Sequence, residues 1–259
     1  NPEEILDRRV YELLFPDSIY GQESGGDPEN IPDLTDQAFR DFHARCYHPS
    51  NSWIYLYGDI DLDEQLEYLD TWLREFDRIE PDSEIAVQAP FDGMKRASFK
   101  YPVTEQTGDD LDYLSLNWVL PARFPLHDSL MFQILSYALM NSNAAPLKKA
   151  LLDSGIAKDI NYSFSTPLLQ PVFTIELKNT SADRTDEFLR IVCDTLSGLA
   201  EKGLDPVDVD AAVNASEFKT LETLGGETGT TPKGLLLGLE MMEAWLYDDD
   251  AFERLRYEG

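Results

Sequence analysis

The sequence contains only three histidines, the residues that most often serve as zinc ligands or general bases. His43 and His48 fall within and just after a helix expected over residues 36–47, and His127 opens a helix expected over 127–140. No pair is spaced as His-x-x-x-His, and neither His-Glu-x-x-His nor its inverse occurs. The sequence therefore predicts structural histidines and no histidine-based zinc site on a single helix.

Three further segments imitate binding or catalytic loops, and each departs from its pattern at a decisive position. Residues 59–64, DIDLDE, resemble the start of a calcium loop, but Glu64 stands where that loop needs a glycine. Residues 225–234, GGETGTTPKG, lack the Gly-Lys-Ser/Thr ending of a phosphate-binding loop. Residues 23–27, ESGGD, are not the Gly-x-Ser-x-Gly of a nucleophile elbow. The residues alone therefore predict turns and helix caps, and no complete active site.

The charge is strongly acidic and evenly spread. The formal net charge is −28, and residues 1–100 and 101–259 contribute −14 each. Such a field repels the phosphates of nucleic acids and anionic membrane surfaces, and it attracts cationic ligands. We therefore expect neither nucleic acid nor membrane as a partner. The alternative to an electrostatic role in binding is that the acidic surface only keeps the protein soluble, and the sequence leaves both open.

Cysteine content and the N-terminal segment indicate a reducing compartment. The two cysteines, Cys46 and Cys193, match no metal spacing and are expected to be reduced and buried. No apolar run approaches the roughly 20 residues of a membrane span. The acidic start is unlike a signal peptide. The expected location is the cytoplasm, or an organelle matrix in a eukaryote.

Apolar residues recur at helical spacing in several segments. Thr35 is expected to cap one of these helices, and Asp61 with Glu64 forms a capping box before another. The first of these two helices is expected to bury one face, formed by Ala38, Phe39, Phe42 and Cys46. The helical segments are 3–15, 36–47, about 62–76, 127–140, 145–155, 183–201, 206–222 and 232–246.

β-Branched and aromatic residues predict several strands. The expected strands are 52–59, 96–103, 111–120 and an antiparallel pair over 159–168 and 171–179. Residues 77–95 lose all periodicity and read as a linker. Because helices and paired strands do not alternate strictly, the order favours an α+β fold: two-layer, antiparallel-rich sheets with helices packed on one face.

Collinear motifs resemble a known family. Residues 15–59 carry YG…SGGDP…IP.LT…FH..YHPSN…YGD, and the resemblance continues over 145–160, 203–218 and 228–258. These stretches resemble the M16 zinc metallopeptidases of the pitrilysin–insulysin type, most closely the presequence protease branch. The motif residues, expected to be structural, are Tyr20, Gly21, Ser24, Gly25, Gly26, Asp27, Pro28, His48, Pro49, Asn51, Gly58 and Asp59.

The resemblance implies four related α+β domains, arranged as two halves that close over a peptide substrate. Zinc would be held in the parent enzyme by an inverted His-x-x-Glu-His motif and a distal glutamate. None of these positions has a counterpart here, so the resemblance implies no catalytic or metal residue and no cofactor in this chain. It implies residues 1–80 as the end of the first domain, 81–95 as a linker and 96–259 as part of the second, non-catalytic domain.

Three functions are consistent with these observations. The first is a non-catalytic part of a zinc endopeptidase that degrades short, unstructured peptides, basic ones included, and that forms part of the chamber wall. The second is a scaffold subunit of the same family that has lost its zinc ligands. The third is an acidic binding module for cationic peptides or proteins. An incomplete domain is also expected to expose apolar surface and to pair through strand edges or dimerise.

Overall fold

The computed structural model describes residues 2–102, 111–225, 232–247 and 250–252. The chain forms two compact units. The first contains residues 1–21 and 87–226, and the second contains residues 22–86 and 227–259. No helix in the described ranges combines the length and the apolar character needed to cross a bilayer.

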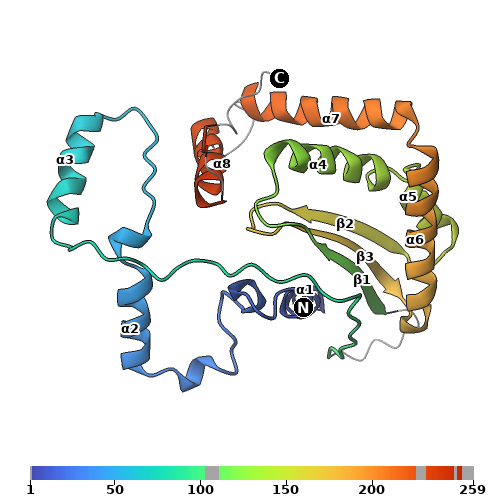
Figure 1. The fold of residues 1–259 in the computed structure, drawn as a ribbon, viewed down its shortest axis with the longest axis horizontal. Helices are drawn as coiled ribbons and strands as arrows, with labels where there is room; N and C mark the ends of the chain where they lie inside the picture. Colours follow the sequence, from blue (N-terminus) through green and yellow to red (C-terminus); the bar gives the residue numbers. More distant parts are fainter. Residues whose placement is uncertain (1, 103–110, 226–231, 248–249, 253–259) are drawn as a thin grey trace. The chain divides into compact units, whose positions relative to one another are not determined.

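A three-stranded antiparallel sheet forms the centre of the first unit (Figure 1). The middle strand pairs with both neighbours, so that Leu116, Ile175 and Tyr162 stand side by side in one row. The strands, in the order in which they lie in the sheet, are β1 (Asp112–Val119), β3 (Val172–Thr180) and β2 (Asp159–Ser165). These strands confirm the predicted strand at 111–120 and the predicted antiparallel pair.

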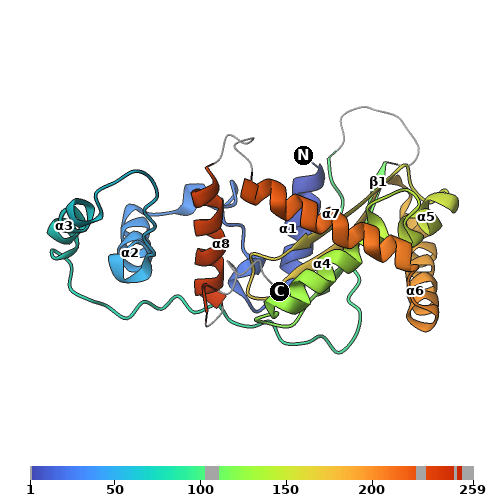
Figure 2. The ribbon, with the colours of Figure 1, turned by 90° about the horizontal axis from the view of Figure 1, so that it is seen from above.

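Alternate residues of the strands face a helical layer, because side chains along a strand point to opposite sides. The central strand presents Phe173, Ile175 and Leu177 to a core shared with three helices. A fourth helix, α7 (Pro206–Gly225), packs on α4 (Figure 2). The helices that share the core are α4 (Leu126–Met140), α5 (Pro146–Asp153) and α6 (Thr185–Lys202). This arrangement confirms the predicted α+β class.

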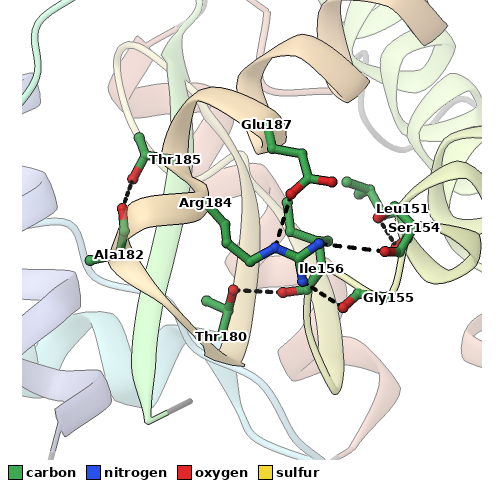
Figure 3. A network of polar contacts seen from close by, with 9 residues as sticks. All are labelled: Leu151, Ser154, Gly155, Ile156, Thr180, Ala182, Arg184, Thr185 and Glu187. Atoms are coloured by element: carbon green, nitrogen blue, oxygen red, sulfur yellow. Dashed lines mark hydrogen bonds and ion pairs between the residues drawn. The ribbon is translucent and has the colours of Figure 1, made fainter. Parts of the chain in front are cut away.

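Polar contacts tie the start of α6 to the turn between α5 and β2 (Figure 3). The Arg184 guanidinium donates to the Gly155 carbonyl at 2.6 Å and to Glu187 Oε2 at 2.9 Å. The buried Thr180 hydroxyl donates to the Ile156 carbonyl at 2.6 Å. These bonds attach the end of the central strand and the start of α6 to backbone carbonyls of the turn.

Helix α1 (Pro2–Leu14) lies on the other face of the sheet (Figure 1). The residues after α1 are tied to the same unit through Gln88, which is only 4% exposed. Its side chain exchanges two hydrogen bonds with Asp17, each 2.9 Å long. Its backbone N–H and C=O pair with the Gln170 side-chain amide at 2.7 and 3.1 Å. Residues 77–95 form no helix or strand, as predicted, and Gln88 ties the first-unit part of this segment to the residues after α1.

The second unit contains helices whose starts follow the predicted caps. Thr35 Oγ1 accepts a hydrogen bond from the Ala38 N–H at 3.1 Å, and Asp61 Oδ1 accepts from the N–H groups of Asp63 and Glu64. Each cap satisfies backbone donors that a helix start leaves free. The helices are α2 (Asp36–Cys46), α3 (Leu62–Leu73) and α8 (Lys233–Tyr247), and short 3₁₀ turns cover Ile31–Asp33 and Pro49–Asn51.

Helix α8 packs against the extended residues 53–57 of the same unit. The hydroxyl of Tyr55 donates to the Gly234 carbonyl at 2.7 Å, and Trp53 stacks on Trp245 with ring centroids 4.8 Å apart. A Cβ atom built on Gly238 would lie 2.2 Å from the Tyr55 ring. The absence of a side chain at this glycine is therefore what lets the aromatic ring approach the helix backbone.

Two predicted strands do not form. Residues 52–59 are extended but are not part of a sheet, and residues 96–102 of the segment 96–103 form no strand; residue 103 lies outside the described residues. A strand is stabilised by hydrogen bonds to a neighbour, and the described residues supply none to either segment. β-Propensity alone therefore overestimated the sheet.

Two burial predictions are also wrong, that of a buried apolar face on α2 and that of two buried cysteines. Phe39 and Phe42 of α2 are 61% and 53% exposed, because no described residues of their own unit cover that face. Cys193 is exposed and Cys46 only half-buried, and both are free thiols. On α6 the buried face is formed by Phe188, Ile191 and Val192, and the next residue turns away from the core.

We expect opposite effects from the same substitution at two helical glycines. Gly198→Ala on α6 should raise the free energy of unfolding by about 1 kcal/mol, because the new Cβ meets open space and alanine favours helix. Gly238→Ala should lower it by about 1 kcal/mol, because displacing the Tyr55 ring costs more than the helix gains. Urea unfolding monitored by tryptophan fluorescence measures both, and stabilisation by both variants would contradict the packing described for α8.

Candidate functional site

The motif residues of the first unit hold a tight turn after α1. The Tyr20 ring packs edge-on against the buried Phe15, with centroids 5.3 Å apart, and its hydroxyl accepts a hydrogen bond from the Leu169 N–H at 2.9 Å. A Cβ atom on Gly21 would lie 2.3 Å from the Phe15 carbonyl oxygen. Both positions therefore serve packing in this structure, and neither exposes a reactive group.

The glycine-rich motif of the second unit, residues 24–28, is an exposed turn. Gly26 has a φ of +84°, which favours glycine. Asp27 Oδ1 accepts a hydrogen bond from the Glu29 N–H at 2.9 Å, an arrangement typical of turns. Ser24, Gly25 and Pro28 are exposed beside them.

The remaining motif residues form a second turn and the end of the extended segment. His48 Nδ1 accepts a hydrogen bond from the Ser50 N–H at 3.1 Å, and the Asn51 side chain donates to the Cys46 carbonyl at 2.9 Å. Pro49 begins the 3₁₀ turn between them. Gly58 and Asp59 are both exposed between the extended segment and α3.

The histidines do not converge. His43 stacks on Tyr47 with centroids 4.9 Å apart, and His127 contacts its neighbour Asp128 at 3.2 Å. Within the described ranges, no three or more His, Cys, Asp or Glu side chains are arranged to hold a metal ion. Most of the GGETGTTPKG segment, residues 226–231, lies outside the described residues.

A cavity of about 590 Å³ separates α1 from the face of the sheet opposite the core. This face carries hydroxyl, amide and charged side chains from all three strands, where the other face carries the apolar core. The residues of the sheet whose side chains alternate onto this face and line the cavity include Ser115, Asn117, Asn161, Ser163, Thr174, Glu176 and Lys178. Helix α1 lines the opposite side of the cavity with Leu6, Asp7, Val10 and Tyr11.

Four charged groups meet at one end of this cavity. Lys178 Nζ lies 2.8 Å from Glu3 Oε1 and 3.3 Å from Glu176 Oε1, and its side chain is 21% exposed. Asp7 lies one helical turn after Glu3 and also lines the cavity. The Lys178 ammonium group thus pairs with one carboxylate of α1 and one of the central strand, and it joins these two elements.

The surroundings shift the pKa of three of these groups. Burial raises the pKa of the Glu176 carboxyl, and the hydrogen bond from Lys178 opposes that effect. Burial also raises the pKa of Asp7, and the nearby Glu3 carboxylate adds to it. The hydrogen bond to Glu3 raises the pKa of Lys178, so this side chain stays protonated at neutral pH. The site therefore carries excess negative charge in a partly desolvated place.

Sequence reasoning did not identify this cluster. The signal was the alternation along residues 172–180, where Thr174, Glu176 and Lys178 share one face of a strand. Its other members, Glu3 and Asp7, lie more than 160 positions away in the sequence. A strand pattern marks a polar face, but it does not say which helix lies on that face.

Comparison with protein families gives a match over residues 33–216 to the family described as the peptidase M16 inactive domain. Protein HypA of Clostridium perfringens is 41% identical over 262 residues, which cover 100% of this chain and 26% of that protein. Presequence protease 1, chloroplastic/mitochondrial, of Arabidopsis thaliana is 37% identical, with 99% of this chain and 24% of that protein covered. The chain thus spans about a quarter of the length of these relatives.

Solved structures share the fold at low sequence identity. A protease from Helicobacter pylori superimposes with a TM-score of 0.64 at 17% identity, covering 99% of this chain and 64% of that one. A peptidase M16 inactive domain from Pseudomonas fluorescens gives 0.63 at 16% identity, covering 92% of this chain and 54% of the other. Both likenesses concern the fold alone.

We expect Lys178→Met to lower the free energy of unfolding by about 2 kcal/mol, between the values typical of exposed and buried ion pairs. The substitution removes the ammonium group that Glu3 and Glu176 share. Lys149→Met is the control, because Lys149 pairs with Asp153 on an exposed surface, and its cost should stay below about 0.5 kcal/mol. Urea denaturation monitored by circular dichroism measures both, and equal losses would contradict the role given to Lys178.

The stability difference between the native chain and Glu176→Gln should depend on pH. The folded-state pKa of Glu176 is raised above its ordinary value of 4.5, so ionisation opposes folding at neutral pH. As the pH falls through the raised pKa towards 4.5, the carboxyl becomes neutral and the native chain gains stability relative to the glutamine variant. Urea midpoints of both proteins between pH 7 and pH 4 measure this trend, and a constant difference would contradict the pKa direction.

Proposed function

The chain belongs to the M16 peptidase family, and on that premise we propose that it is a non-catalytic portion of a zinc-dependent endopeptidase that degrades short, unstructured peptides. The observation that carries the proposal is the match of residues 33–216 to the inactive domain of that family. Relatives named presequence proteases support the peptide substrate. In this view the chain helps to enclose the peptide, and the cleavage chemistry belongs to other parts of a longer protein.

The polar face of the sheet supports a role in a chamber wall. Globular sheets bury one face and leave the other to solvent or to a ligand. Here the second face offers hydroxyl, amide and carboxylate groups around a cavity of about 590 Å³. Such groups hydrogen-bond to peptide amides without selecting one sequence, as broad peptide degradation requires.

The described residues do not fit a zinc ion. His43 and His48 belong to one unit and His127 to the other, and each has a structural contact of its own. Zinc, which the family resemblance implies for the parent enzyme, would therefore be held by residues outside this set. No step of catalysis is assigned to this chain.

Exposed apolar faces support contact with other domains of the same longer protein. Trp72 and Leu66 of α3 are 53% and 58% exposed, and Phe39 of α2 is 61% exposed. Apolar patches of this kind on a soluble protein usually mark an interaction surface.

The two free thiols agree with a reducing compartment, the cytoplasm or an organelle matrix.

We expect no chelator-sensitive peptide cleavage by this chain alone, and chelator-sensitive cleavage by the longer protein from which it comes. The assay follows an internally quenched peptide with and without a zinc chelator, and then with zinc restored. Cleavage by the 259-residue chain that zinc restores would overturn the proposal. If the longer protein lacks both His-x-x-Glu-His and hydrolysis, the chain belongs to a scaffold subunit instead.

The net charge of −28 favours a second candidate, an acidic binding module for cationic proteins. Binding of that kind weakens steeply with salt, because exposed charges are screened over about 3 Å at 1 M. An affinity for basic partners that persists at about 1 M salt would count against this candidate.

A further inference from the structure

The cavity under α1 has the volume of a small-ligand site. Its volume of about 590 Å³ falls within the roughly 300–1,000 Å³ of small-ligand pockets. The helix above it contributes Leu6, Val10 and Tyr11 beside the carboxylate of Asp7, and the sheet below contributes polar groups together with the apolar Val172. A site lined by both apolar and polar groups suits a ligand that has both kinds of surface.

Among the described residues, the polar side chains that the sheet presents to the cavity have hydrogen-bond partners on β1 and β3, but those on β2 do not. Next to β1, Asn117 Nδ2 donates to Ser115 Oγ at 2.6 Å, and Thr174 Oγ1 donates to Asn117 Oδ1 at 2.8 Å. On β2, the side chains of Asn161 and Ser163 have no hydrogen-bond partner among the described residues, and both are exposed. The β2 side of the cavity therefore keeps donors and acceptors available to a ligand.

The carboxylate of Asp7 lines this cavity without a paired cation in the part of the chain that the structure describes. Lys178 contacts Glu3 and Glu176 and does not reach Asp7 within ion-pair distance. Among the described residues Asp7 has no cationic partner, although it lines the cavity. A second cation beside Asp7 would be attracted by the carboxylates of Asp7 and Glu176, which line the cavity, and repelled by the Lys178 ammonium group.

We propose that this cavity binds the guanidinium or ammonium group of a basic side chain carried on an extended peptide. Asp7 is the charge partner, and Asn161 and Ser163 bind the peptide's amide groups. The aliphatic stem of the basic residue lies under Leu6 and Val10, since such stems bury along apolar surface. The choice of a peptide rests on the proposed function; the choice of a cation rests on the cavity itself.

The test is fluorescence anisotropy of the 259-residue chain with a labelled hexapeptide of alanine and serine around one central arginine. The matched peptide carries citrulline, which keeps the shape of arginine without its charge. We expect the citrulline peptide to bind at least about tenfold more weakly, the loss typical of one charge-assisted contact. Spermidine as a competitor separates a peptide site from a site for any small polyamine.

Three variants separate the site from the overall charge of the protein. Asp7→Asn should weaken the arginine peptide about tenfold. Asp194→Asn removes the same charge from the exposed surface of α6 and should change the affinity less than about twofold. Asn161→Asp adds a carboxylate at an exposed floor position and should tighten binding, a gain that misfolding does not produce.

Several results would overturn the inference. They are equal affinities for the arginine and citrulline peptides, equal effects of Asp7→Asn and Asp194→Asn, weaker binding by Asn161→Asp, or no binding at millimolar peptide. Spermidine binding as tightly as the arginine peptide would replace the peptide by a free polyamine. None of these readouts involves hydrolysis, so loss of this site leaves the proposed peptidase role standing, and failure of zinc-dependent cleavage leaves the site standing.

Discussion

The alternation of side chains along β3 is the constraint on which the first unit depends. This strand bonds to both neighbours, so its register decides which residues of β1 and β2 face the helices. Phe173, Ile175 and Leu177 enter the core with α4, α5 and α6, and the residues between them enter the cavity under α1. A shift of one residue would exchange these two sets. The hydrophobic core and the candidate site are therefore two consequences of a single pairing.

Helix α1 is held to the sheet in two ways that differ in kind. Lys178 provides a charged contact near the start of α1, in a place where water is partly excluded. Beyond the other end of α1, a hydrogen-bond network of Asp17, Gln88 and Gln170 fixes the chain through backbone partners as well as side chains. Salt screens the charged contact more than it affects the hydrogen bonds to backbone groups. The two attachments of α1 therefore differ in how strongly salt weakens them.

Local rules predicted the helices and their caps from the sequence, because a helix satisfies its hydrogen bonds within one segment. Thr35 and Asp61 cap as expected, and Gly155 ends α5 with a φ of +63°. Strands depend on partners, and so the equally strong pattern at 52–59 formed no sheet. The cavity depends on Glu3 meeting Lys178, a contact between distant positions that no short motif encodes. The family was visible in loop motifs whose residues make turns, which is why recognising it gave no site.

The contact between α8 and residues 53–57 depends on two repeat distances that are nearly equal, one along the helix and one along the extended segment. Two residues of extended chain advance about 6.6 Å, and four residues of α-helix advance about 6 Å. The Tyr57 ring therefore packs on Gly234 and the Tyr55 ring packs on Gly238, one helical turn further along α8. Inserting or deleting one residue in the extended segment would bring Ile54 and Leu56 to the glycines in place of the tyrosines. Natural length variation is thus expected in the turns on either side and not within these five positions.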